Sequence, residues 1–132
     1  MKVNYTVTLA ILVGFGLGGI TVPGLHAQAK PPVYHIIEID VSNADGYVKE
    51  FVPLAQQSVK SSGGRQLAVG GPAGARMMAV EGPLPQSRIS VQVWDSMEAI
   101  RSWLDSAAWK DARGIGDKYA KFRSYTIEGL PR

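Results

Sequence analysis

The order of strand-like and helix-like segments leaves few folds open to this chain of 132 residues. Runs rich in β-branched and aromatic residues, the clearest with alternating polar and apolar positions, predict strands. These runs are Val33–Val41, Arg65–Val69, Arg76–Glu81, Ser87–Trp94 and Phe122–Glu128. One helical pattern follows the first run and another follows the fourth. The second and third runs flank a Gly-rich loop and are predicted to form a hairpin, so the order is β-α-β-β-α-β with the second strand split.

The first helical pattern begins after Asn43, whose side-chain oxygen can cap a helix. Its apolar residues recur at helical spacing and are Tyr47, Phe51, Leu54, Ala55 and Val59. Pro53 lies inside this pattern and cannot donate a backbone hydrogen bond, so we expect a kink or a late helix start there. Gly63 and Gly64 follow the pattern, where glycine accepts the left-handed backbone that ends many helices.

The second helical pattern has Asp95 as its expected N-cap, with Glu98 three positions later as in a capping box. Its apolar stripe is Met97, Ile100, Leu104 and Ala107. Further helical turns are expected between Trp109 and Tyr119. Two helices and four strands in this order predict a ferredoxin-like α+β domain, with an antiparallel sheet and both helices on one of its faces.

Alternation along the strands divides the predicted sheet into two faces. We expect the more apolar positions to lie beneath the helices, namely His35, Ile37, Ile39, Ile89, Val91, Val93, Tyr125 and Ile127. The other face then mixes apolar and polar side chains, including Tyr34, Glu38, Arg88, Gln92 and Trp94. Such a face is too apolar for open water and too polar for a dry core. It therefore predicts a homodimer in which two sheets meet around a small cavity.

The mixed face supplies the candidate ligand-binding and catalytic groups. Arg88 can hold a carboxylate, Trp94 can stack on a ring and Gln92 can hydrogen-bond a ligand. For catalysis, Glu38 is the first candidate and Tyr34 the second, with Arg88 as the stabiliser of an oxyanion. The alternative for the same side chains is an ion pair and packing between subunits.

Other residue types exclude several kinds of site and partner. Arg65 and Glu81, at the two hairpin arms, are further ligand-binding candidates or a cross-strand pair. His35 is the only histidine after residue 29 and the chain has no cysteine, so we expect no metal site and no cofactor. Basic residues are spread singly along the chain, so nucleic acid is not an expected partner.

The first 29 residues have the features of a secretory signal peptide. Lys2 precedes an uncharged apolar run, and Ala27 and Ala29 form the A-x-A pattern of a cleavage site. We expect cleavage after Ala29 and export to the periplasm or the medium, with an uncleaved membrane anchor as the alternative. The protein then meets a membrane only through this segment. Residues 30–132 remain as one domain with 13 basic and 11 acidic side chains.

Short motifs along most of that domain resemble the domain-of-unknown-function 1330 family. The motifs are Gly63-Gly64-Arg65, Glu81-Gly82, Arg88 with Asp95–Ala99, Trp103–Trp109 and Ile127-Glu128-Gly129. The resemblance implies a ferredoxin-like subunit that pairs sheet to sheet, as in the dimeric α/β-barrel proteins. Val93-Trp94 stands where the family tends to have an acid followed by Phe, and Trp103-Leu104 where it has Trp-Tyr. The resemblance therefore implies a fold and a dimer, and no chemistry.

Three functions remain open for such a protein. The first is a small-molecule-binding module, whose cavity between the two sheets holds an apolar or carboxylated ligand. The second is a cofactor-free enzyme of the oxygenase or isomerase type that uses the same cavity. The third is a structural dimer with a filled interface and no ligand. An enclosed cavity that contains Glu38 or Arg88 would favour the first two.

Overall fold

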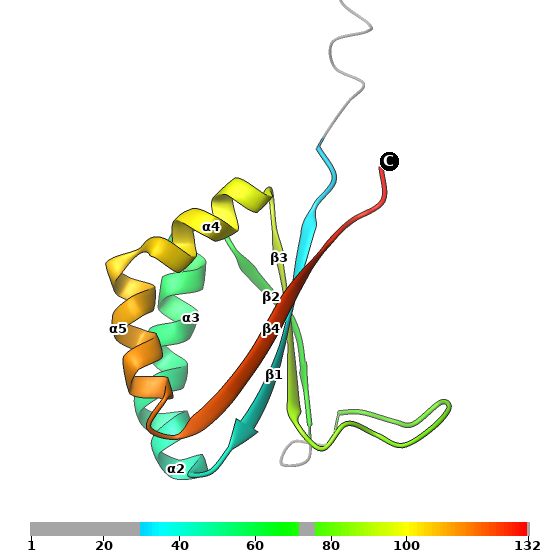
Figure 1. The fold of residues 1–132 in the computed structure, drawn as a ribbon, viewed down its shortest axis with the longest axis vertical. Coiled ribbons are helices and arrows are strands. Elements are labelled where there is room, and N and C mark those ends of the chain that lie inside the picture. The colour runs from blue at the N-terminus through cyan, green and yellow to red at the C-terminus, as the bar shows by residue number, and fades with distance from the viewer. Residues whose placement is uncertain (1–29, 72–75, 132) are drawn as a thin grey trace, which may run out of the picture. The chain divides into compact units, whose positions relative to one another are not determined.

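The computed structural model describes residues 30–71 and 76–131, which form an antiparallel sheet with helices on one face (Figure 1). The strands are β1 (Val33–Val41), β2 (Arg65–Gly70), β3 (Arg88–Trp94) and β4 (Ala120–Glu128). The helical segments are α2 (Ala44–Gly46), the π-helical turn η1 (Tyr47–Phe51), α3 (Val52–Ser61), α4 (Met97–Asp105) and α5 (Ala107–Gly116). The predicted signal peptide and its cleavage site lie outside the described residues.

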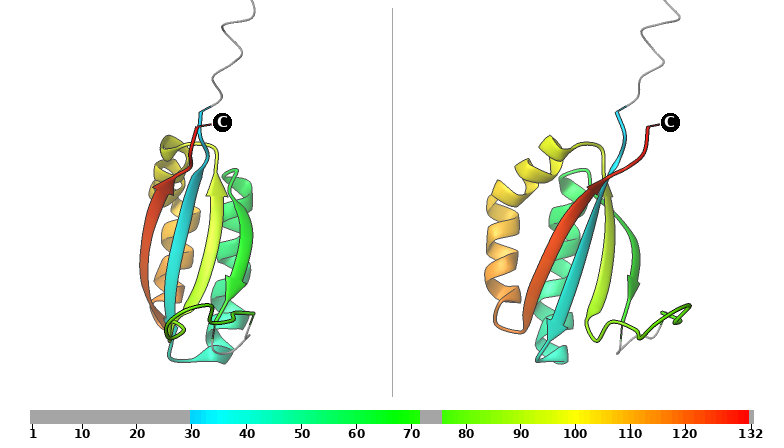
Figure 2. Two further views of the ribbon diagram at one scale, coloured as in Figure 1. Left: turned by 90° about the vertical axis from the view of Figure 1, so that its right-hand side faces the viewer. Right: turned by 45° about the vertical axis from the view of Figure 1, so that its right-hand side comes forward.

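The four strands lie in the order β2-β3-β1-β4, with β1 antiparallel to both β3 and β4. Figure 2 shows the uncovered face of this sheet toward the viewer, with the helices behind it. We call this uncovered side of the sheet the open face. The arrangement confirms the predicted ferredoxin-like fold. No helix among the described residues is long and apolar enough to cross a membrane.

The predicted hairpin arm at Arg76–Glu81 is wrong. Residues 76–87 form no strand, and β2 pairs directly with β3. The Met77 side chain nevertheless packs against the end of β2. A Cβ atom on Gly70 would lie only 2.5 Å from the Met77 Cγ atom. The β-branched and aromatic residues that favour a strand are scarce in this segment, which contains Gly82, Pro83 and Pro85. The segment instead leaves the sheet as a projecting loop (Figure 1).

The first helical region begins as predicted and continues with an unusual turn. The Asn43 side chain accepts a hydrogen bond from the Gly46 N–H at 3.1 Å. The chain then forms η1, in which the Val52 N–H bonds to the Tyr47 carbonyl five residues earlier. Pro53 occupies the first turn of α3, where its missing N–H costs least. The disturbance expected at Pro53, a kink or a late helix start, takes another form: the helical backbone is continuous from Ala44, and a π-helical turn precedes the α-helix that begins at Val52. Gly63 ends the region with φ +89°.

The second helical region is two helices rather than one. Ser96 is the N-cap of α4 and accepts a hydrogen bond from the Ala99 N–H at 3.1 Å, so the assignment of Asp95 as the cap is wrong. Ser106 caps α5 in the same way, through the Trp109 N–H. The buried side chain of the last turns of α4 is Trp103, whereas Leu104 is 41% exposed. The predicted apolar stripe is therefore displaced by one residue at this end.

The predicted division of the sheet into faces is also wrong for two of the strands. Residues that pair directly across an antiparallel sheet lie on the same face. His35 pairs with Gln92 on β3 and with Thr126 on β4, and Ile39 pairs with Arg88. The helices therefore cover His35, Ile37 and Ile39 together with Arg88, Ser90, Gln92, Trp94 and Phe122. The open face carries Tyr34, Ile36, Glu38, Ile89, Val91, Val93, Tyr125 and Ile127.

Candidate functional site

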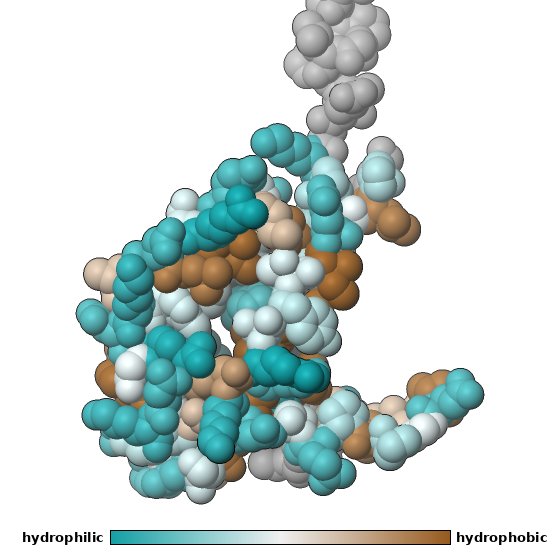
Figure 3. Space-filling view, in the orientation of Figure 1, coloured by the Kyte–Doolittle hydropathy of each residue, from teal (hydrophilic) through white to brown (hydrophobic). Residues whose placement is uncertain are grey.

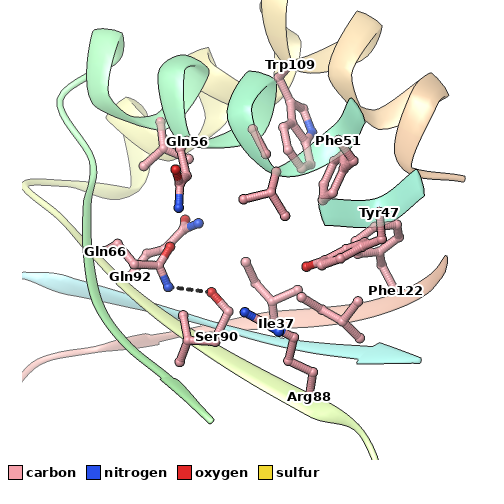
Figure 4. A pocket seen from close by; sticks show the side chains of 15 residues that line it. Ile37, Tyr47, Phe51, Gln56, Gln66, Arg88, Ser90, Gln92, Trp109 and Phe122 are labelled. Carbon is pink, nitrogen blue, oxygen red and sulfur yellow. Dashed lines mark hydrogen bonds between the residues drawn. The ribbon is translucent and has the colours of Figure 1, made fainter. Parts of the chain in front are cut away.

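A cavity of about 70 Å³ lies between the sheet and the helices, inside a single subunit. Figure 4 shows side chains reaching into it from both layers. Those from the helices include Tyr47, Phe51, Val52, Ala55, Gln56, Val59 and Trp109. Those from the strands are Ile37, Ile39, Gln66, Val69, Arg88, Ser90, Gln92 and Phe122. No Asp or Glu is among these lining residues, so the side chains around the cavity carry a net positive charge.

The apolar wall depends on the π-helical turn. Tyr47 and Phe51 are the two buried residues of η1, and their rings lie 5.3 Å apart. Phe51 also contacts Trp109 at 6.3 Å and Phe122 at 5.2 Å between ring centroids. Single π-helical turns occur frequently at functional sites, because they change the direction in which side chains leave a helix. Here the turn directs two aromatic rings toward the same space.

The polar wall is made of amide and hydroxyl groups on β2 and β3. The Gln66 Nε2 donates to the Ser90 Oγ at 2.7 Å and to the Ala68 carbonyl at 3.0 Å. The Gln92 Oε1 accepts a hydrogen bond from the Trp94 Nε1 at 3.3 Å. Because the oxygen end of Gln92 is engaged in this way, its amide N–H groups are the end that can serve a ligand.

His35 lies behind the polar wall and orients Gln92. The His35 Nδ1 is 3.2 Å from the Gln92 Oε1, and a carboxamide oxygen only accepts, so Nδ1 carries the proton. The imidazole packs edge to face against the Trp103 ring, with 5.8 Å between the ring centroids. Burial lowers the pKa of His35, and the hydrogen bond to Gln92 opposes that shift less strongly. The ring is therefore neutral at pH 7 and acts as a structural support of the site.

Arg88 stands where the cavity meets the surface. Its guanidinium carbon lies 5.8 Å from the centroid of the Tyr47 ring. Burial raises the pKa of Tyr47, and the positive charge of Arg88 opposes that shift. Within the described residues, no carboxylate forms an ion pair with Arg88. Arg88 also lines two adjoining hollows of about 410 and 470 Å³. The arrangement offers an unneutralised cation next to aromatic and amide surfaces.

The structure brings only part of the predicted candidate set together. Arg88 and Gln92 line the cavity, on the helix-covered face rather than the open face. Trp94 is on the same face, but it is 1% exposed and packs against Trp103 at 4.9 Å, so its ring is not free to stack on a ligand. The cavity that contains Arg88 thus lies within one subunit instead of between two sheets.

The remaining candidates lie away from this cavity. Tyr34 and Glu38 are on the open face, where the Glu38 Oε2 accepts a hydrogen bond from the Arg123 Nε at 2.7 Å. Arg65 lies opposite Val93 at the edge of the sheet and is exposed. Glu81 is exposed in the projecting loop, and no ion pair joins it to Arg65 in the described part of the chain. The proposed roles of these four residues remain hypotheses.

Sequence reasoning missed several lining residues. Tyr47 and Phe51 were expected only as part of the apolar stripe of a helix, and Trp109 only at the start of later helical turns. Gln56 and Gln66 were not singled out. The position of Pro53 just after two aromatic residues was the one available signal, since it predicts a distorted helix beside them. Among the described residues there is no group of three His, Asp or Glu side chains that could hold a metal ion.

The fold is shared with several solved structures of low sequence identity. They have the same ferredoxin-like arrangement and are 11–13% identical to this chain. The chain itself belongs to the DUF1330 family, a domain of unknown function, whose model matches residues 32–130. No curated protein matches it in sequence.

Three solved structures illustrate the similarity of fold. A protein of unknown function from Rhodopseudomonas palustris has a TM-score of 0.61 and 11% identity, over 93% of this chain and 94% of that chain. SnoaB, a cofactor-independent oxygenase from Streptomyces nogalater, has a TM-score of 0.54 and 13% identity, over 76% and 94%. A protein from Nitrosomonas europaea assigned as an antibiotic biosynthesis monooxygenase has a TM-score of 0.53 and 11% identity, over 76% and 92%.

Proposed function

We propose that this protein binds a small, flat, anionic molecule between the sheet and the helices of each subunit. The observation that carries the proposal is Arg88, a cation without a carboxylate partner among the described residues, at the mouth of an aromatic and amide-lined cavity. Arginine binds carboxylates through paired, charge-assisted hydrogen bonds. Aromatic walls formed by Tyr47, Phe51 and Trp109 suit a planar apolar body.

The size of the space adds a constraint on the ligand. The cavity of about 70 Å³ is smaller than the roughly 300 Å³ of an ordinary ligand pocket. Arg88 and Tyr47 line both this cavity and the adjoining hollow of about 470 Å³. A ligand is therefore expected to place its charged group at Arg88 and to extend from the cavity into that hollow.

Calorimetric titration with 2-naphthoate and 2-naphthamide tests this function, because the two compounds share a shape and differ in charge. We expect the acid to bind at least tenfold more tightly than the amide, since a hydrogen bond to a charged group contributes about 1.5–3 kcal/mol. Arg88→Ala should remove that preference, and Arg101→Ala, an exposed arginine on α4, should keep it. Equal binding of the two compounds, or no binding of either, would contradict the proposal.

A cofactor-free enzyme is the second candidate function. SnoaB, which shares the fold, is a cofactor-independent oxygenase. Arg88 beside the Tyr47 phenol provides the positive charge that would stabilise a phenolate or enolate intermediate. Oxygen consumption in the presence of a polycyclic phenol, lost in Arg88→Ala and retained in Arg101→Ala, would support this function. The absence of turnover with a bound ligand would leave binding alone as the function.

We also propose that the open face pairs with a second copy of the chain. This face carries apolar side chains at its centre, Ile36 and Val91, and the exposed rim residues Tyr125 and Ile127. Tyr125 is 47% and Ile127 53% exposed in the isolated subunit. A contiguous apolar surface of this kind marks an interaction site, and two-fold pairing would cover it on both copies. A structural dimer without a ligand is the remaining alternative.

Export is a further part of the proposal. The uncharged apolar run after Lys2 and the Ala27–Ala29 pattern support cleavage before Lys30. Expression of the full chain with separation of cell fractions should give a periplasmic or secreted product. Its intact mass should equal that of a chain that begins at Lys30. A full-length product that stays with the membrane would favour the uncleaved anchor instead.

A further inference from the structure

The described segment that precedes β3 exposes large apolar side chains to solvent. We call residues 76–87 the arm. It leaves the sheet on the side of the open face, opposite the helices (Figures 1 and 2). Figure 3 shows it standing clear of the body, with hydrophobic side chains near its tip. Met78 is 82% exposed and Val80 is 92% exposed, so contacts within their own subunit remove almost none of their apolar surface from water.

We infer that the arm packs against a second copy of this chain, with Met78 and Val80 in contact with the partner. The inference rests on the proposed homodimer through the open face. Sheets that pack face to face lie about 10 Å apart. A partner on the open face would therefore occupy the space into which the arm projects. Met78 and Val80 are the arm residues whose burial by that partner would stabilise the dimer most.

The length of the arm is sufficient for this contact. Extended chain covers about 3.3 Å per residue, so twelve residues running out and back can reach at most about 20 Å. That reach is about twice the spacing of two packed sheets. An arm of that length is long enough to contact the partner's open face, and in a symmetric dimer each subunit would contribute one such arm.

The charge of the arm favours a protein partner over a lipid surface. The arm has one basic residue, Arg76, and one acidic residue, Glu81. Binding to anionic lipid depends on several basic side chains close together, each contributing about 1 kcal/mol. An arm without net charge lacks that attraction, whereas Met78 and Val80 complement an apolar protein surface such as that formed by Ile127 and Tyr125.

A cysteine-based cross-link tests the contact directly, because the chain has no cysteine of its own. Val80→Cys would be labelled with benzophenone maleimide, and Leu54→Cys on α3 would be the control, since Leu54 is 45% exposed on the helix-covered side. Equal amounts of ¹⁴N and ¹⁵N protein would be mixed, equilibrated and irradiated. Mass spectrometry then distinguishes links between copies from links within one copy.

We expect Val80→Cys to give links between copies to peptides of β3 or β4, and Leu54→Cys to give none. Sedimentation velocity should show a dimer for the wild type, and Met78→Asp with Val80→Asp should weaken it at least tenfold, while Leu54→Asp leaves it unchanged. A dimeric wild type with links only within one copy, or with unchanged affinity in the arm variant, would overturn the role of the arm and leave the dimer intact. A monomeric wild type would overturn both.

Discussion

At the scale of single residues, His35 is a buried group whose protonation affects the stability of the folded state. It is 4% exposed, packed on Trp103 and hydrogen-bonded to Gln92. Burial lowers its pKa below the ordinary value of 6.5, so folding favours the neutral ring. The unfolded chain then binds the proton more readily than the folded chain. The contribution of His35 to stability is therefore complete above about pH 6.5 and is lost as the pH falls through the lowered pKa.

Urea denaturation of the wild type at pH 7.5 and pH 5.5 should show a lower free energy of unfolding at pH 5.5. His35→Gln removes the titrating ring, so it should lower stability at pH 7.5 and make the difference between the two pH values smaller. Equal differences in the wild type and in His35→Gln would contradict the assignment of this pH dependence to His35.

Alternation along each strand correctly identified the residues that share a face within that strand. It did not fix which face of β3 matches which face of β1, because both faces of this sheet contain apolar side chains. Arg88 and Gln92 were therefore predicted as site residues and assigned to the wrong side. The register of β1 with β3, which pairs Ile39 with Arg88 and His35 with Gln92, decides which residues share a face. Such pairing between strands distant in sequence cannot be inferred from the residues of one strand.

At the scale of elements, two glycines of α5 have opposite surroundings. A Cβ on Gly116 would lie 2.7 Å from the Phe51 ring and 3.1 Å from that of Phe122. A Cβ on Gly114 would meet no atom within 4 Å. Gly116 is thus the position where α5 approaches the apolar wall of the cavity, and Gly114 is a solvent-facing position in the same helix.

Alanine substitutions at these two positions should change stability in opposite directions. Gly116→Ala should lower the free energy of unfolding by about 1–3 kcal/mol, because it forces two packed rings to move. Gly114→Ala should raise it by about 0.5–1 kcal/mol, through the higher helix propensity of alanine. Urea denaturation of the two variants measures both effects. A stabilising Gly116→Ala would show that the wall formed by Phe51 and Phe122 is less tightly packed than described.

Elements with strong local signals were predictable and those set by longer-range packing were not. The first strand, the Asn43 cap and the effect of Pro53 all agree with the structure, because each depends on neighbours in sequence. The projecting arm was mistaken for a strand, and the π-helical turn was not foreseen. The turn places Tyr47 and Phe51 against Trp109 and Phe122, so tertiary contacts support a geometry that local propensity disfavours.

At the scale of the whole molecule, the open face explains how a small domain without a disulfide can enlarge its apolar core. The centre of that face is the pair Ile36 and Val91, with Tyr125 on the other side of Ile36. The sheet buries its other face under the helices, so pairing would cover both sides of the sheet. The chain has no cysteine that could form a disulfide, and a domain as small as residues 30–132 buries a smaller fraction of its surface than a larger domain does.

Ile36→Arg should convert the dimer into a monomer, because it places an unpaired charge at the centre of the proposed interface. The side chain points to the open face, so the isolated subunit should stay folded. Leu54→Arg, on the helix-covered side, is the matched control and should remain dimeric. Size-exclusion chromatography with light scattering measures the mass of each. A dimer of undiminished stability in Ile36→Arg would place the interface elsewhere.

The ligand is proposed to bind between the sheet and the helices of one subunit, with its anionic group at Arg88. The most direct test is a crystal structure of the protein with 2-naphthoate. We predict density for the ring beside Tyr47 and Trp109, and the carboxylate within hydrogen-bond distance of the Arg88 guanidinium. Density between two open faces, or a carboxylate held by another residue, would contradict this location of the ligand site.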